Sequence, residues 1–201
     1  MPKEDSKNRE GVLRGGLDEV GRGCLAGPLT IAVVAFAADH PQIPGVRDSK
    51  KMSKKQRELL APRIYREAAF IGLGWVDAQY IDKHGMVVAW QEAAMRALEG
   101  APEMELIVDG VDIVSDYTGK QRAVVKADDK HWEVSAASVV AKVLRDKEMA
   151  YMASFYPGFA WESNSGYGTA AHRKQILDAG PNHLHRMTFL KKLFASSSSA
   201  S

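Results

Sequence analysis

The chain has 201 residues, 45% of them hydrophobic, which is enough to bury one substantial core in one compact domain. Its formal net charge is only +2, but basic residues cluster within 47–57, which permits contact with nucleic acid without proving it. The single cysteine, Cys24, excludes an internal disulfide and a cysteine-rich metal site, and no segment resembles a signal peptide or a membrane span, so we expect a cytoplasmic protein without membrane contact.

The predicted elements in the first half of the chain alternate between strands and helices. Residues 13–18 and 29–37 are apolar runs that predict two strands joined by a glycine-rich turn. Ser53 is a plausible helix N-cap, and apolar residues at helical spacing follow it as far as Tyr65. The apolar segment 69–76 then predicts a third strand.

The second half of the chain continues this alternation. Residues 87–98 suit an amphipathic helix that ends before Gly100, and 106–108 and 124–125 predict two short strands. The longest helical candidate covers residues 134–155. We therefore expect an α/β fold with a central mixed β-sheet flanked by helices and a C-terminal helical extension.

Composition divides the chain into four parts. The polar residues 1–11 and the serine-rich residues 196–201 carry too little apolar surface to offset their ordering entropy, so we expect two disordered tails. Residues 12–158 should form the main domain, and residues 159–195 a helical extension that packs on it.

Acidic residues follow three of the predicted strands. Asp18 and Glu19 end the first strand, Asp109 follows the fourth, and Asp128 lies just beyond the fifth. Each one alone is more often a turn or helix-cap residue. However, side chains at the strand ends of an open α/β sheet gather over one crevice. Carboxylates held together there would repel one another unless hard cations such as Mg²⁺ or Mn²⁺ lie between them, which predicts a two-metal site for phosphodiester hydrolysis.

The segments around these acids resemble the motifs of a known family. Residues 16–28, with the sequence GLDEVGRGCLAGP, are similar to the opening motif of ribonuclease HII, the type 2 ribonucleases H. Further matches to this family follow in order along the chain, at residues 48–53, 107–110, 126–128, 135–146 and 165–169, at His172, and at residues 185–189. The resemblance covers roughly residues 13–194.

This resemblance implies a ribonuclease H-like catalytic domain over residues 12–158. It implies an endoribonuclease that hydrolyses the phosphodiester on the 5′ side of ribonucleotides in RNA:DNA hybrids, and of single ribonucleotides embedded in duplex DNA. The products would carry 3′-hydroxyl and 5′-phosphate ends, and the enzyme would take part in ribonucleotide removal from DNA. Two Mg²⁺ or Mn²⁺ ions would be held by four catalytic, metal-binding acids, namely Asp18, Glu19, Asp109 and Asp128.

The fourth acidic site departs from the family pattern. Ala127 stands where the family more often has glycine, and a second acid, Asp129, adjoins Asp128. The register of the fourth ligand is therefore open between these two neighbours, and we favour Asp128.

The glycine-rich loop after the first acids is a candidate for substrate recognition. Gly21 and Gly23 flank Arg22, and residues without a Cβ let backbone amides approach a sugar or phosphate, although a plain tight turn fits as well. The resemblance implies that this loop reads the ribose 2′-hydroxyl together with Tyr167, which otherwise suits a position in the core or at its rim.

Three further residues are candidates for contact with the nucleic-acid backbone. Lys50 could contact the scissile or a neighbouring phosphate, and Ser138 and Lys142 share a helical face that could hold the backbone farther along. Arg145 and Asp146 fit a structural ion-pair network better than a substrate contact.

The C-terminal segment invites readings that we do not favour. His183 and His185 have the spacing of a ligand pair but lack the partners of a zinc site, so packing and capping roles are expected. The apolar residues 189–190 and 193–194 should pack the last helix, and docking on a replication clamp is the alternative.

We expect a monomer that acts on RNA:DNA hybrids and on DNA duplexes containing ribonucleotides. The rival functions are a non-catalytic nucleic-acid-binding module and a related nuclease that requires ribonucleotide tracts.

Overall fold

The computed structural model describes residues 12–198, so the tail expected at 1–11 and the last three residues of the tail expected at 196–201 lie outside the described residues. A five-stranded sheet has the order β3-β2-β1-β4-β5. The strands are β1 (Leu13–Val20), β2 (Leu29–Ala37), β3 (Phe70–Val76), β4 (Met104–Asp109) and β5 (Gln121–Val124). The helices that flank the sheet are α1 (Lys54–Glu67), α2 (Ala78–Ala97) and α3 (Trp132–Phe155), with two short 3₁₀ helices, η2 (Ser49–Lys51) and η3 (Ala127–Asp129).

The sheet is mixed, as the sequence predicts. β1 pairs antiparallel with β2, and β2 pairs antiparallel with β3. On its other side β1 pairs parallel with β4, which pairs parallel with β5. β1 therefore lies at the centre of the sheet, and its C-terminal end points in the same direction as that of β4.

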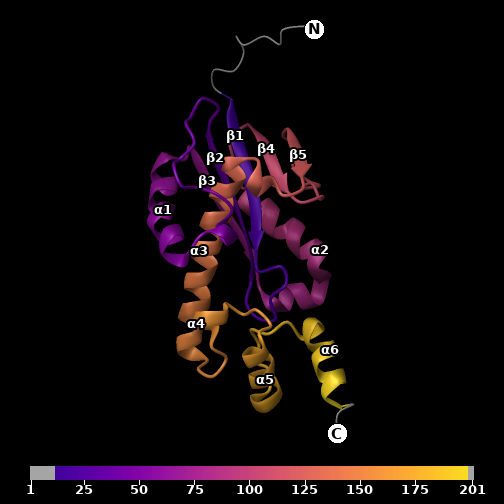
Figure 1. The fold of residues 1–201 in the computed structure, drawn as a ribbon. Helices are drawn as coiled ribbons and strands as arrows, with labels where there is room; N and C mark the ends of the chain where they lie inside the picture. Colours follow the sequence, from indigo (N-terminus) through magenta and orange to yellow (C-terminus); the bar gives the residue numbers. More distant parts are fainter. Residues whose placement is uncertain (1–11, 199–201) are drawn as a thin grey trace.

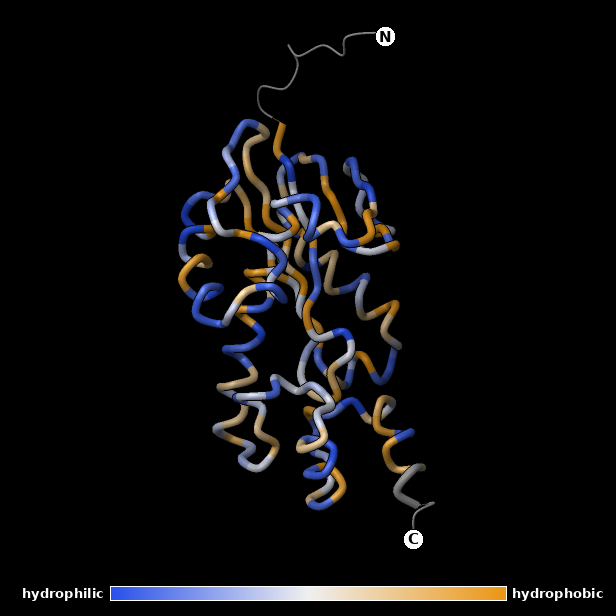
Figure 2. Tube along the Cα trace, viewed as in Figure 1, coloured by the Kyte–Doolittle hydropathy of each residue, from blue (hydrophilic) through white to orange (hydrophobic). Residues whose placement is uncertain are grey.

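Helices cover both faces of this sheet (Figure 1). α2 packs on one face, where Leu17, Ile31 and Val33 meet Trp90 and Ala93 in a buried core. α1 and α3 cover the other face around a second core of alternate strand residues, which is what the period of two along a strand requires. Figure 2 shows hydrophobic residues along the strands and many hydrophilic residues in the surrounding loops and helices.

The C-terminal part is helical, as expected. It comprises α4 (Trp161–Asn164), α5 (Ala170–Ala179) and α6 (Met187–Ser198), which lie beyond the C-terminal end of β1 (Figure 1). A third core joins these helices to α3 and to the loop after β1, and it includes Ala26, Met149 and Trp161. One prediction was wrong here, because residues 196–198 belong to α6 and are not part of an unstructured tail.

Two element boundaries differ from the prediction. The helix predicted at 87–98 begins at Ala78, because Asp77 caps it by accepting a hydrogen bond from the backbone N–H of Tyr80. Gly85, with φ of 80°, kinks the helix and interrupts the apolar period in its first half. The strand predicted at 124–125 is β5, which ends at Val124. Across residues 12–198, the structure has no helix with the length and apolar character needed to traverse a lipid bilayer.

Candidate active site

Asp18 lies on the face of the sheet that α3 covers, and it is only 3% exposed. Gly16, two residues earlier on the same face, lets the start of α3 approach β1 closely, because a Cβ there would lie 2.3 Å from the backbone of Glu133 and Val134. This close approach brings the buried hydroxyl of Ser138 to the Asp18 carboxylate, to which it forms a hydrogen bond.

Two more carboxylates lie on the same face. The parallel register of β1 and β4 ends with Leu17 opposite Val108, so the next residues, Asp18 and Asp109, occupy adjoining strand ends. Asp109 accepts a hydrogen bond of 2.7 Å from the backbone N–H of Ala127, which ties β4 to η3. η3 in turn carries Asp128, which is 7% exposed. A hollow of about 480 Å³ is lined by Asp109, Asp128 and their neighbours.

Glu19 points to the opposite face of the sheet. Neighbouring side chains of a strand alternate between faces, so Glu19 faces α2 while Asp18 faces α3. Its carboxylate accepts a hydrogen bond of 3.1 Å from the indole Nε1 of Trp90 and lies 3.5 Å from the guanidinium of Arg22. The prediction placed both acids in one cluster, whereas the structure directs their side chains to opposite faces of the sheet.

Crowding of the carboxylates changes their protonation. Burial raises the pKa of Asp18 from 3.8 to about 8, and the charges of Glu19 and Asp109 add to this shift. Burial also raises the pKa of Asp128, with further contributions from Asp48 and Asp109. Without a bound cation, the cluster therefore resists full ionisation near neutral pH.

Lys50 is the cation nearest to this cluster. Its Nζ lies 3.7 Å from an Asp128 carboxylate oxygen, and its side chain is 76% exposed. Partial burial lowers the pKa of the Lys50 ammonium, but the charges of Asp18 and Asp128 outweigh that effect and the net shift is upward. Asp48 holds η2 in place by accepting a hydrogen bond from the backbone N–H of Lys50.

The two neighbouring acids of η3 have different surroundings. Asp129 is 40% exposed and forms an ion pair with Lys51, which lowers its pKa through their hydrogen bond. Asp128 is buried and faces Asp48 and Asp109. This geometry favours Asp128 over Asp129 as the fourth acid.

Ser138 does not lie on the surface where a nucleic-acid backbone could reach it. It is 1% exposed, and its hydroxyl lies 2.7 Å from that of Ser49. When Ser138 donates to Asp18, Ser49 is the donor that satisfies the oxygen of Ser138. The contact therefore supports the orientation of Asp18, and the substrate contact expected for Ser138 has no support in this arrangement.

The glycine-rich loop after β1 folds around two buried arginines that sequence reasoning did not single out for it. Arg145 donates to the carbonyls of Ala26, Pro28 and Ser165, at 2.7 to 3.1 Å. Arg186 donates to the carbonyls of Arg22 and Gly27, which lie five residues apart in the loop.

Neither of these arginines has a carboxylate partner. Both side chains belong to fully buried residues, and among the described residues neither forms an ion pair. The ion-pair role predicted for Arg145 was therefore wrong, whereas Asp146 does pair with Lys142 and Arg57. Gly21 is required beside Arg145, because it has φ of +93° and a Cβ would lie 2.2 Å from the guanidinium Nε.

Tyr167 stands next to this loop. It is 42% exposed, and Lys142 lies 5.5 Å from the centroid of its ring. Its carbonyl accepts a hydrogen bond of 2.9 Å from Nδ1 of the buried His172, and the backbone of Gly166 accepts from Leu25 and Ala26. Tyr167 and Lys142 therefore lie beside the loop after β1, in which Arg22 and Gly23 are exposed and Gly21 is buried.

The carboxylates fit Mg²⁺ or Mn²⁺ in their chemistry, since all the candidate donors are hard oxygens. In the described part of the chain, however, no three His, Cys, Asp or Glu side chains stand ready to enclose an ion. Three of the candidate donors are turned to protein partners: Asp18 to Ser138, Glu19 to Trp90 and Asp109 to Ala127.

Comparisons with known proteins point to one family. A family model described as Ribonuclease HII matches residues 15–194. The chain is 44% identical over 184 residues to Ribonuclease HII of Synechococcus sp. (strain WH7803), covering 89% of this chain and 95% of that protein. It is 41% identical over 191 residues to Ribonuclease HII of Synechococcus sp. (strain CC9311), covering 92% and 97%.

Solved structures show the same fold. The ribonuclease H2 from Pyrococcus horikoshii OT3 superposes with a TM-score of 0.75 at 28% identity, covering 92% of this chain and 98% of that one. The ribonuclease HII in the PCNA complex from Archaeoglobus fulgidus superposes with a TM-score of 0.74 at 27% identity, covering 88% and 94%.

Proposed function

Because the chain belongs to the ribonuclease HII family, and is therefore a ribonuclease, we propose that it cuts duplexes on the 5′ side of ribonucleotides, including single ribonucleotides embedded in DNA. The products would carry 3′-hydroxyl and 5′-phosphate ends. The observation that carries this proposal is the convergence of Asp18, Asp109 and Asp128 on one face of the sheet beside an exposed tyrosine and a glycine-rich loop.

The four acids would hold divalent cations. Mg²⁺ or Mn²⁺, two ions per site, would supply an activated water and stabilise the leaving oxygen when bound. The strand ends of β1 and β4 fix the positions of Asp18 and Asp109, and η3 brings Asp128 to them. Glu19 would join the site by giving up its hydrogen bond with Trp90 and binding a metal ion, which requires its side chain to turn away from α2.

The recognition surface would decide where cleavage occurs. Backbone groups of Gly21, Arg22 and Gly23 can approach the ribose 2′-hydroxyl, and the ring of Tyr167 can stack at the junction between ribonucleotide and deoxyribonucleotide. Arg145 and Arg186 would keep this loop in shape, because they satisfy its carbonyls from beneath.

Lysines would place the substrate backbone. Lys50 stands at the mouth of the acid cluster, where a phosphate would replace its contact with Asp128. Lys142 lies beside Tyr167 and would hold a phosphate near the recognised nucleotide. Ser138 would act on Asp18 and not on the substrate.

A contact between the C-terminus and a replication clamp also remains a proposal. The Archaeoglobus relative was solved as a complex with PCNA. In this chain Phe189, Leu190, Leu193 and Phe194 pack against the hydrophobic cores, as expected for a helix that completes the fold. A clamp would therefore have to bind residues at the far end of α6, and pull-down with and without the residues after 194 would test this.

The decisive experiment maps the ends of products from a DNA duplex that contains one ribonucleotide, with and without Mg²⁺ or Mn²⁺. We expect one cut on the 5′ side of the ribonucleotide, and only when metal is added. Cleavage of long RNA:DNA hybrids alone would favour a nuclease that needs ribonucleotide tracts. Binding without any metal-dependent cleavage would favour a binding module.

A variant sharpens the assignment of the acids. Asp109→Asn should abolish cleavage and largely preserve duplex binding, because the substitution removes one carboxylate without changing side-chain size. Asp116→Asn, at an exposed position outside the site, is the matched control. Near-normal turnover by Asp109→Asn in Mg²⁺ would overturn the two-metal assignment.

A further inference from the structure

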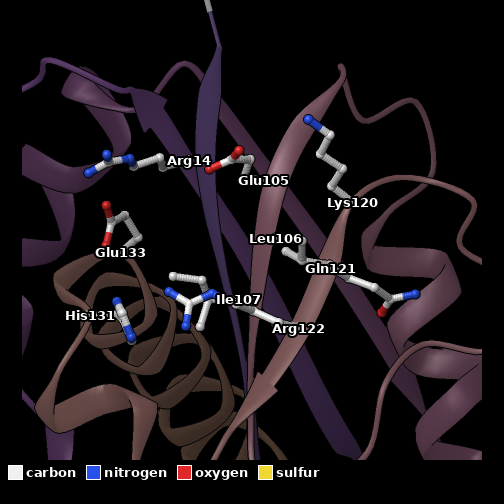
Figure 3. A pocket seen from close by; sticks show the side chains of 9 residues that line it. All are labelled: Arg14, Glu105, Leu106, Ile107, Lys120, Gln121, Arg122, His131 and Glu133. Carbon is white, nitrogen blue, oxygen red and sulfur yellow. The ribbon is translucent and has the colours of Figure 1, made fainter. Parts of the chain in front are cut away.

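A second hollow, of about 380 Å³, lies on the same face of the sheet as the acids, at the N-terminal ends of the strands. Arg14 of β1, Arg122 of β5 and Glu105 of β4 line it, together with His131 and Glu133 at the start of α3. Figure 3 shows the Arg122 side chain extending from β5 toward His131, with Arg14 on β1, on the other side of β4. The proposed function gives this hollow no role.

The three cations that line this hollow form no ion pair with the acids of the described residues. Within residues 12–195, Arg14, Lys120 and Arg122 form no ion pair, although Glu105 and Glu133 line the same space. Most of the other arginines described are paired or hydrogen-bonded, as Arg57, Arg63 and Arg96 are. Burial and the charge of Arg122 also lower the pKa of His131, which fits a locally positive potential.

This hollow joins the catalytic one through a third. The catalytic hollow and a neighbouring one of about 360 Å³ share Asp128, and that neighbour shares His131 with the hollow of Arg14 and Arg122. Together the three form a track that leads from Asp109 past η3 to the start of β1. Basic residues border the track at Lys50, Lys126, Arg47, Lys51, Lys130 and Arg122.

The length of this track suits a nucleic-acid strand. Arg14 and Asp18 lie on the same face of β1, four residues apart, which is about 13 Å at about 3.3 Å per residue. One strand of a duplex carries a phosphate about every 3.4 Å along the helix axis. The hollow is therefore placed to meet the backbone a few nucleotides from the acids.

Building on the proposed function, we infer that Arg14 and Arg122 bind a backbone phosphate of the substrate duplex, a few nucleotides away from the cleaved bond. The planar guanidinium group can donate to two oxygens of one phosphate, and here two guanidinium groups line one hollow from β1 and β5, with β4 between them. The contact carries no sequence information, so it adds affinity and register and leaves the choice of nucleotide to the recognition surface.

Two carboxylates limit the affinity of this hollow for phosphate. Glu105 is exposed at its edge and Glu133 is buried at its base, so a free phosphate ion would gain little there. A duplex that is already bound at the acids and at Tyr167 presents its phosphate to the hollow at a high local concentration. Even a weak phosphate contact there therefore adds to the affinity for the duplex. Removal of the Glu105 charge should therefore strengthen the contact.

The test compares binding of duplexes that contain one ribonucleotide and differ in flank length. Full-length wild-type chain, R14Q/R122Q, E105Q and the control K83Q, an exposed lysine on α2 across the sheet, are titrated by fluorescence anisotropy in EDTA over a range of salt concentrations. The flanks have about two or about twelve base pairs on either side. Thermal melting of each variant verifies that it is folded.

R14Q/R122Q should weaken binding of the long duplex roughly fivefold and reduce the slope of log K against log salt by about one. E105Q should tighten binding, K83Q should resemble wild type, and shortening one particular flank should erase the difference between R14Q/R122Q and wild type. Equal affinity and slope for R14Q/R122Q and wild type on every duplex would overturn the inference. A wild-type chain that binds but does not cut this duplex when metal is restored would instead overturn the proposed function.

Discussion

Replacement of Asp18 by Asn should stabilise the metal-free protein, even though it destroys the candidate active site. The Asp18 carboxyl is 3% exposed, and its pKa is raised from 3.8 to about 8. The folded chain therefore binds a proton there at pH values where the unfolded chain has released it. The contribution of the protonated Asp18 carboxyl to the free energy of unfolding is therefore fully present below pH 3.8 and is lost as the pH rises toward 8.

The size of the effect follows from this window. Each pH unit between the two pKa values corresponds to about 1.4 kcal/mol. At pH 7.5 the Asp18 carboxyl therefore lowers the free energy of unfolding of the wild-type chain by at most about 5 kcal/mol. Asn has no proton to lose and can still accept the hydrogen bonds that Asp18 receives from Ser138 and from the backbone N–H of Glu19. The advantage of Asp18→Asn should thus be near zero at pH 4 and level off near pH 8.

Urea unfolding in EDTA at several pH values measures this advantage directly, with Asp116→Asn as an exposed control. Added Mg²⁺ should reverse the order, because ions that bind the folded wild-type carboxylates stabilise that chain. An advantage that does not change with pH, or a wild-type chain that is the more stable at pH 7.5 in EDTA, would refute the reasoning.

Two further predictions concern the support of the recognition loop. Arg145→Lys should lower the free energy of unfolding by about 3 kcal/mol, since one ammonium cannot reach three separate carbonyls; an unchanged urea midpoint, judged against the exposed control Lys147→Arg, would contradict this. Burial and the neighbouring His172 lower the pKa of His185 from 6.5 to about 4, so stability present above pH 6.5 should be lost as pH falls toward 4, by up to about 3 kcal/mol. His185→Gln should remove this acid sensitivity, and an equally steep loss in that variant would assign it to other groups.

The sheet and its order of elements were predictable because apolar runs and glycine turns report local structure directly. The acids at 18, 109 and 128 could also be grouped, since strand ends of parallel neighbours must meet at one edge. The start of α2 could have been found from Asp77, a cap residue, but the period breaks at Gly85 and hid the first half of the helix.

The rest of the site depends on contacts that leave no local signal. Arg145 and Arg186 bind backbone carbonyls, which every residue possesses, so no partner type marks them in the sequence. Ser138 shares a helical face with Lys142, but only the close approach of α3 at Gly16 decides that the serine is buried and the lysine is not. The opposite directions of Asp18 and Glu19 follow from strand alternation once β1 is known to extend to Val20.

The two buried arginines also determine when the loop after β1 can fold during synthesis of the chain. The loop after β1 takes its carbonyl partners from Arg145 in α3 and from Arg186, which follow Gly21 by more than a hundred residues. A ribosome that adds about 5–20 residues per second needs roughly ten to thirty seconds to pass from Gly21 to Arg186. During synthesis the acids of β1 therefore exist well before the loop beside them can be held, and the newly made chain acquires its recognition surface only after Arg186 has been added.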